Sequence, residues 1–226
     1  MGGSSVRYEP ENLDALMLYA EVYQRFMQAR WVSYFERLRG FNERAVLEFT
    51  QNLREGYSVV NTVSISVTKE DVAAVTGFPT IGERWFSRKV HLPEAQKDFL
   101  IEVEQVQAKG RGEDVKLLPE PWGNVAEFLK RYITCEGRYQ VVYFYDFILL
   151  SHLRHQRLIN MPYYLLHSLH NMARYVQKSK NPKNCITNHR LIGLLIRRGM
   201  GIPNDPLPER EEHPNPILVV VAEPEE

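Results

Sequence analysis

Apolar residues recur at steps of three and four positions along most of this chain, which is the pattern of amphipathic helices packed against a core. The first run covers residues 12–39 and predicts one helix that ends at Gly40. A second run covers residues 43–54, where Gly56 follows at a position that commonly closes a helix. Next, a short helix is predicted to begin after Thr68, whose hydroxyl can accept hydrogen bonds from the first backbone N–H groups, and to end at Gly77.

The second half of the chain shows the same helical spacing, interrupted by short segments rich in Gly, Pro and Asn. Connections of this length are typical of antiparallel helices that pack as neighbours. We therefore expect a helical bundle. The predicted helices cover residues 93–106, 122–133, 139–155, 162–178 and 187–198.

One segment follows a different period. Between residues 57 and 67, β-branched residues alternate with polar ones, which indicates a β-strand or a hairpin. The sequence therefore predicts a mainly α fold, a helical bundle with a minor β-strand or hairpin element near residues 57–67.

The domain organisation follows from breaks in this pattern. Residues 1–10 are predicted to be a flexible N-terminus, and residues 11–200 a single mainly helical domain. The small and charged stretch at 109–115 is the one place where a subdomain break is expected. Residues 201–226 form a Pro/Glu-rich tail, which cannot hold a helix, although its apolar stretch at 217–221 could add an edge strand to a partner or to its own domain.

Composition narrows the function classes. The 226 residues include 28 basic and 28 acidic side chains, so any affinity for a polyanion must come from a local patch. Two cysteines are too few for a disulfide framework and favour a reducing, intracellular location, either nuclear or cytoplasmic. The longest apolar stretch, 141–150, is too short to cross a membrane, so we expect a soluble protein with no membrane partner.

Several segments, in a fixed order, resemble the plant transposon protein family, a set of transposon-derived plant sequences associated with retroelements. The resemblance covers roughly residues 30–198 and depends on the order and spacing of apolar motifs. It implies a plant source and a transposon-derived origin, and it supplies no catalytic residue. Members often lie within larger element-encoded chains. The segments that carry the resemblance are 41–53, 67–72 with 76–79, 159–166 with Ser168, Leu169 and Met172, and 188–192.

Four histidines form the sharpest candidate metal site. His152 with His155, and His167 with His170, are two pairs spaced three residues apart on consecutive predicted helices. Facing helices of a bundle can bring such pairs together around a metal ion. Neither pair has the glutamate of a zinc-binding helix motif, so we interpret them as polar histidines at a helix rim and expect no metal site.

No other pattern indicates catalysis. Cys135 and Cys185 have no flanking sequence typical of a cysteine nucleophile. The chain contains no P-loop, nucleophile elbow or dinucleotide fingerprint, and the glycines at 110 and 112 follow a predicted helix, which is the wrong context for a phosphate cradle. We therefore expect no catalytic residues, no cofactor and no enzyme activity.

A basic segment near the C-terminus is the candidate for nucleic-acid binding. A phosphate-binding surface needs several cations on one face together with aromatic platforms, which this segment could supply. The alternative, which we favour, is a solvated rim that pairs with the acidic tail residues Glu209, Glu211 and Glu212. The candidate nucleic-acid-binding residues are Arg174, Tyr175, Lys178, Lys180, Lys183, Arg190, Arg197 and Arg198.

The leading hypothesis is a non-catalytic protein-interaction module that binds a protein partner or another copy of itself. Trp85 and Phe86 in an irregular segment, with Trp122 after two prolines, are the candidate partner-binding residues, because aromatic side chains are enriched at interface anchors. For each Trp taken alone, packing in the core is the competing interpretation. A nucleic-acid-binding domain that uses the segment 174–198 is the alternative function.

Overall fold

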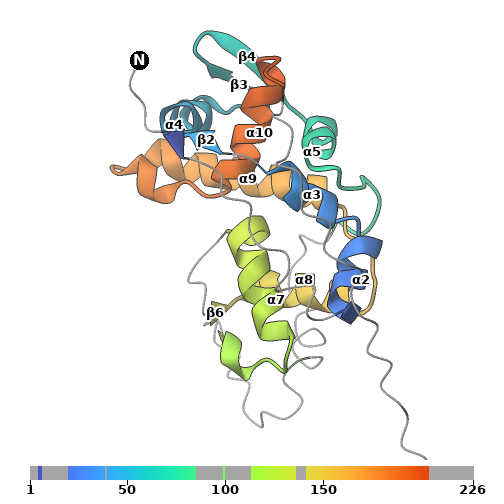
Figure 1. Ribbon diagram of the computed structural model, residues 1–226. Helices are drawn as coiled ribbons and strands as arrows, with labels where there is room; N and C mark the ends of the chain where they lie inside the picture. Colours follow the sequence, from blue (N-terminus) through green and yellow to red (C-terminus); the bar gives the residue numbers. More distant parts are fainter. Residues whose placement is uncertain are drawn as a thin grey trace, which may run out of the picture.

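The computed structural model describes residues 5–6, 20–38, 40–84, 99, 113–135 and 141–203. These residues form a mainly helical protein with a small antiparallel hairpin, which confirms the predicted fold class (Figure 1). Within these ranges, no helix is both long enough and apolar enough to cross a membrane. The predicted helix at 93–106 lies outside the described residues, apart from Phe99, and so do residues 109–112 and 204–226 of the expected break and tail.

The single helix predicted over residues 12–39 is wrong in its described part. The chain forms α2 (Ala20–Gln28) and a separate α3 (Val32–Arg37). Between them Arg30 adopts a left-handed conformation with φ of +59°, and the Trp31 N–H donates to the Phe26 carbonyl at 2.9 Å. The break changes which side chains face inward, because Trp31 is buried whereas Met27 is about half exposed.

An aromatic cluster explains why this break is stabilised. The Phe26 ring meets the Trp31 ring edge to face at a centroid distance of 5.6 Å, and Phe35 contacts Phe128 in the same way at 4.6 Å. Tyr34 completes the joint, since its hydroxyl donates to the Tyr132 carbonyl at 3.2 Å. Edge-to-face pairs add stability beyond the burial of their area. The cluster thereby connects α2 and α3 to α7 (Trp122–Leu129) and to the π-helical turn η2 (Lys130–Thr134).

The hairpin follows α4 (Glu43–Asn52), whose first turn is capped by the Asn42 side chain. Strands β3 (Gly56–Val60) and β4 (Val63–Val67) pair with Val60 opposite Val63, so the alternating segment folds back on itself. The turn consists of Asn61 and Thr62, both with positive φ, as in the tight turns that suit the twist of a hairpin. Val60 and Val67 are buried, whereas Val63 is exposed. A further short pair joins β1 (Ser5–Val6) to β2 (Phe41–Asn42).

Helix α5 (Lys69–Thr76) begins and ends as the sequence predicts. The Thr68 hydroxyl accepts from the Asp71 N–H at 3.1 Å, and the Asp71 carboxylate accepts from the Thr68 N–H at 3.0 Å. This reciprocal pair satisfies two backbone donors that the first turn would otherwise leave without partners. At the other end, Gly77 adopts the left-handed conformation with φ of +76°.

In the second half, the predicted helix at 139–155 is shorter in the structure, because residues 141 and 142 pair with β5 as a strand. The helix predicted at 122–133 has a π-helical last turn, and those at 162–178 and 187–198 agree to within two residues. The elements are β5 (Glu113–Asp114), η1 (Val115–Leu117), α7, η2, β6 (Val141–Val142), α8 (Phe144–Arg154), α9 (Met161–Lys178), η3 (Pro182–Cys185) and α10 (His189–Gly199).

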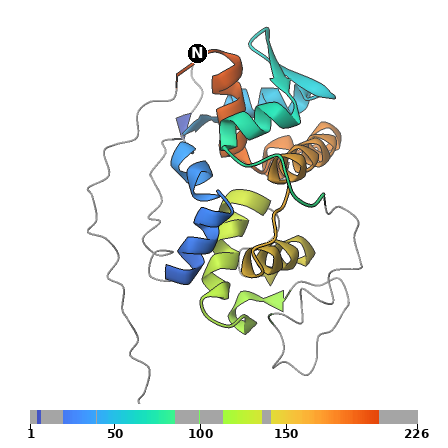
Figure 2. The ribbon, with the colours of Figure 1, turned by 90° about the vertical axis from the view of Figure 1, so that its right-hand side faces the viewer.

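Helix α9 is the centre of the arrangement. Figure 1 shows it running across the molecule, with α4, α5, α10 and the hairpin on one side and α2, α7 and α8 on the other. The view turned by 90° in Figure 2 shows the same two layers stacked along the vertical direction. The inward face of α9 is fully buried at Leu165 and Leu169, and α10 buries Leu191 and Ile192 against the same core. The surfaces described below lie on the outside of this core.

Candidate interaction surfaces

The candidate partner-binding tryptophan at 122 lies in the core. Trp122 begins α7, its side chain is only 8% exposed, and its ring meets the Phe99 ring at a centroid distance of 5.3 Å. This is the packing interpretation that the sequence left open for a single Trp. Trp85 and Phe86 lie outside the described residues.

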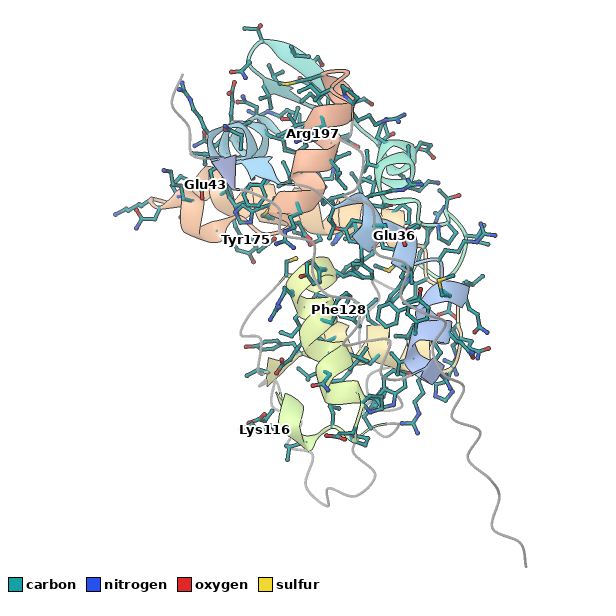
Figure 3. All side chains as sticks on the ribbon, viewed as in Figure 1. Glu36, Glu43, Lys116, Phe128, Tyr175 and Arg197 are labelled. Carbon is teal, nitrogen blue, oxygen red and sulfur yellow. The ribbon has the colours of Figure 1, made fainter. Side chains whose placement is uncertain are left out.

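The basic segment 174–198 does not form one surface. Tyr175 lies on the second half of α9, and Arg197 lies near the far end of α10, beside the hairpin (Figure 3). Arg190, in the first turn of α10, has its guanidinium 5.2 Å from the centre of the Tyr132 ring. A cation over an aromatic face stabilises packing, so Arg190 connects α10 to η2. The eight candidates therefore separate into two outer groups and one packing residue.

The first outer group is the α9 basic patch, which we define as Arg174, Tyr175, Lys178, Lys180 and Lys183. All five side chains are exposed, and Tyr175 is the most exposed large hydrophobic residue described, at 73%. Cations around an accessible aromatic ring are the elements of a surface that binds single-stranded nucleic acid. The α9 basic patch thus retains the chemistry that the sequence suggested.

The second outer group is Arg197 and Arg198 in the last turn of α10, and Arg198 lines a pocket. Arg198 at the end of α10 and Arg37 at the end of α3 line an open pocket of about 270 Å³, together with residues of α5 and the segment after α10. Val75 and Leu194 are buried and lie at its floor, whereas Ile202 at its edge is 46% exposed. We call this the α3–α5–α10 pocket. Its second cation, Arg37, could not be predicted as a site residue, because it belongs to a run whose spacing is typical of one continuous helix.

Both arginines are positioned by α5. The Arg37 Nη1 atom donates to the Ala74 carbonyl at 2.9 Å, and the Arg198 Nε atom lies 3.7 Å from Asp71 Oδ1. Burial alone would raise the pKa of Asp71, but hydrogen bonds from Ser66 and Thr68, with the nearby charge of Arg198, hold that pKa below its ordinary value. Asp71 is therefore ionised at neutral pH, and the capping box of α5 also orients one wall of the pocket.

His152 and His167, one from each candidate metal-binding pair, contact groups other than a second histidine. The His152 Nδ1 atom lies 2.9 Å from the Ile148 carbonyl, and its Nε2 atom lies 3.3 Å from Glu83 Oε2. His167 lies 3.1 Å from the Asn171 amide nitrogen. Among the residues that the structure describes, no three or more His, Cys, Asp or Glu side chains form a group that could hold a metal ion.

A buried ion pair was not foreseen. The Lys130 Nζ atom lies 3.0 Å from Asp146 Oδ2, and the two side chains are 1% and 3% exposed. Asp146 also accepts from the Thr134 hydroxyl at 2.8 Å and from the Tyr143 N–H at 2.8 Å. Burial raises the pKa of Asp146, while these donors and Lys130 favour its charged form. The network joins η2 to the start of α8 inside the core.

Comparison with known proteins adds no assignment to this geometry. No protein-family model, no curated protein and no solved structure matches the chain. Two outer surfaces, the α3–α5–α10 pocket and the α9 basic patch, are the candidate binding sites of the chain.

Proposed function

We propose that the chain is a non-catalytic protein-interaction module, derived from a plant transposon, that binds a protein partner or a second copy of itself through the α3–α5–α10 pocket. The observation that carries this proposal is the composition of the pocket, which is lined by two arginines together with Val75, Leu194 and Ile202. Arginine is enriched among the residues that dominate binding energy at protein interfaces. The order and spacing of the motif segments support the transposon origin.

The size of the pocket also favours a protein ligand. A volume of about 270 Å³ lies just below the range of about 300 to 1,000 Å³ for pockets that enclose small molecules or cofactors. Such a volume accommodates one or two side chains. An open pocket of this size suits the insertion of a side chain from a protein partner better than the enclosure of a substrate.

An unbiased peptide selection tests this function. A random peptide library is displayed on phage and selected on the full-length chain, with counter-selection on the double variant Arg37→Gln/Arg198→Gln. We expect a family of peptides that binds the wild-type chain and loses affinity for the double variant. If repeated selections return no peptide that distinguishes the two proteins, the pocket is not a protein-binding site.

Nucleic-acid binding is the second candidate, and the exposure of Tyr175 among four exposed cations favours it. Phosphate contacts release counterions, so the affinity for a single strand should fall with a salt slope of about −0.7 for each contact. Removing three such contacts should therefore reduce the slope by about 2.

The test for this candidate uses two sets of substitutions on different helices. Lys178→Gln, Lys180→Gln and Lys183→Gln alter the α9 basic patch, and Arg197→Gln with Arg198→Gln alter the far end of α10. Binding of a labelled single-stranded oligonucleotide is measured by anisotropy at several salt concentrations. Loss of binding and of salt slope with the first set alone would establish this candidate. If the wild type and the variant with the first set of substitutions bind the oligonucleotide equally, the α9 basic patch is a solvated rim.

A further inference from the structure

Within the part of the chain that the structure describes, the two guanidinium groups of the α3–α5–α10 pocket keep hydrogen-bond donors that no neighbour accepts. A guanidinium carries five N–H donors in a planar fork that matches a carboxylate. The hydrogen bond from Arg37 to the Ala74 carbonyl employs one of its terminal nitrogens, and Asp71 lies beside the Nε atom of Arg198. The Arg198 side chain is about half exposed. The pocket can therefore receive an anionic group from solvent.

The apolar lining of the pocket indicates that its ligand also carries an apolar group. Val75 and Leu194 belong to the core and are almost fully buried, so the apolar surface open to a ligand is mainly that of Ile202 at the rim. An anion alone would leave this surface in contact with water. Burying a Leu-sized side chain on it would gain favourable free energy in proportion to the covered area. The ligand that fills the pocket thus has an anionic group beside an aliphatic one.

The charge of the surroundings discriminates between anions. The Arg37 and Arg198 guanidinium groups, with the Asp71 carboxylate beside Arg198, leave a net charge of +1 at the pocket. The attraction of an anion to this charge grows in proportion to the anion's own charge, whereas the cost of removing the anion from water grows with the square of that charge. A carboxylate, with one negative charge, therefore suits the pocket better than a phosphate monoester, whose charge is about −1.5 to −2 at neutral pH.

We infer that the α3–α5–α10 pocket recognises an acidic peptide segment in which a carboxylate side chain lies next to an aliphatic side chain. The inference rests on the proposed function, because it names the chemistry of the protein partner. In the complex, the carboxylate pairs with Arg37 and Arg198, and the aliphatic side chain packs on the apolar surface that Ile202 exposes at the edge of the pocket, where α3, α5 and α10 meet (Figure 1).

Defined peptides test this inference on the full-length chain. The probe is a short fluorescent peptide with Asp-Leu at its centre between Gly-Ser flanks. Three matched peptides replace Asp by Asn, Asp by phosphoserine, or Leu by Ala. Replacing a charged hydrogen-bond partner should weaken binding about 10- to 100-fold, and removing the aliphatic group should weaken it about tenfold or more. The phosphoserine peptide should bind more weakly than the Asp peptide.

Variants of the chain, titrated with the same Asp-Leu peptide, provide a second test. Arg198→Gln alters an exposed side chain and should fold normally, and Arg37→Lys keeps the charge while removing the planar fork. Both substitutions should weaken binding of the Asp-Leu peptide by at least about tenfold. The control is Lys116→Gln, which removes one positive charge, as Arg198→Gln does, from an exposed position that does not line the pocket. Lys116 lies at the opposite end of the molecule from Arg197 (Figure 3). The control should leave peptide binding unchanged.

The outcomes separate this inference from the proposed function. If library peptides depend on Arg37 and Arg198 but carry no acidic residue, the inference fails and the proposed function stands. If neither library peptides nor the Asp-Leu peptide bind through the pocket, both fail. Tighter binding of the phosphoserine peptide would overturn the carboxylate assignment. Stronger competition by a peptide of residues 205–226, or self-association that Arg198→Gln abolishes, would assign the pocket to the chain's own tail or to a second copy instead.

Discussion

The Lys130 ammonium lies 3.0 Å from the Asp146 carboxylate, and both groups are almost completely removed from solvent. The ring of Tyr143 covers the ammonium at 4.4 Å from its centre, and the Thr134 hydroxyl donates to the carboxylate. A charged pair in a protein core is tolerated only where such additional contacts compensate for the lost hydration. The network therefore fixes the register between η2 and α8, two elements that support the aromatic cluster.

Lys130→Met should destabilise the protein by about 3 to 5 kcal/mol, because it leaves the Asp146 carboxylate buried without its cation. The free energy of unfolding is measured by urea denaturation of the variant and the wild type. The double variant Lys130→Met/Asp146→Leu should recover part of the loss, since no charge remains buried. Lys116→Met, at an exposed position, is the control. A loss below about 1 kcal/mol for Lys130→Met would show that the pair is hydrated in solution.

The Lys130–Asp146 pair corresponds to a signal in the sequence that hydrophobic spacing does not capture. Lys130 stands four residues after Ala126 and three before Ile133, on the apolar face of its helix, and Asp146 lies three residues before Leu149. One charge of each sign on the inner face of two consecutive helices is a signal for a buried pair. Hydrophobic spacing alone treats such residues as interruptions, so it predicts the helices and misses their connection.

The break at Arg30 could not be predicted in this way. A continuous helix over residues 12–39 would place Met27, Trp31 and Tyr34 on one face, and this spacing is what the sequence displays. The structure instead exposes Met27 and buries Phe26 against Trp31. Aromatic contacts with α7 and η2, about a hundred residues away in sequence, determine where the helix breaks. The pocket was missed for the same reason, since Arg37 and Arg198 are brought together only by tertiary packing.

Thr62→Gly should stabilise the hairpin. Thr62 has a φ of +68°, a left-handed conformation that costs a residue with a side chain roughly 1 to 2 kcal/mol, and its side chain is exposed. Glycine removes that strain but adds freedom to the unfolded chain, so the expected net gain is about 0.5 to 1 kcal/mol. The measurement is the midpoint of urea unfolding. Thr62→Ala, which keeps the Cβ atom, should give no such gain, and an equal gain from Ala would refute the backbone explanation.

The stability of the protein should fall as the pH drops below about 7, in part through His189. Burial lowers the pKa of His189, and its ring stacks on Phe41 at a centroid distance of 5.1 Å. In the unfolded chain the imidazole titrates near its ordinary pKa of about 6.5. The contribution of this group is therefore present above pH 6.5 and lost as the pH falls toward the lower pKa of the folded state.

His189→Phe keeps a ring against Phe41 and removes the titration, so it isolates this effect. Unfolding free energies measured between about pH 7.5 and 5 should depend less on pH in His189→Phe than in the wild type. Some dependence should remain, because burial also lowers the pKa of His167 and His170. His155→Gln at an exposed position is the control. An unchanged slope in His189→Phe would contradict the assignment.

Leu165→Ala should cost about 2 to 5 kcal/mol, because Leu165 is fully buried on the central helix α9 and its truncation leaves a cavity. The adjacent Leu166 is only partly buried and offers a matched control on the same helix. Leu166→Ala should cost clearly less. Thermal and urea unfolding of both variants measure the difference. Equal losses would mean that the face of α9 assigned to the core is not the one that carries the packing.

Asp71→Asn should move stability and ligand affinity in opposite directions, because Asp71 both caps α5 and offsets the charge of Arg198. Loss of the carboxylate weakens the capping box and should cost about 1 kcal/mol at neutral pH. Because the pKa of Asp71 is lowered in the folded state, its contribution is present above the ordinary pKa of about 3.9 and lost as the pH falls through the lower folded value. The stabilities of the variant and the wild type should therefore converge in acid.

The same substitution raises the net charge of the α3–α5–α10 pocket from +1 to +2, with Arg37 and Arg198 unchanged. Anionic peptides should then bind more tightly, and the phosphoserine peptide should gain more than the Asp-Leu peptide, because its charge is nearly twice as large. Anisotropy titrations with both peptides at low and moderate salt measure the two affinities. Glu70→Gln, in the same turn of α5 but fully exposed, is the control for the loss of one negative charge. If Asp71→Asn and Glu70→Gln change the two affinities equally, Asp71 does not set the charge of the pocket, and the preference for a carboxylate must have another cause.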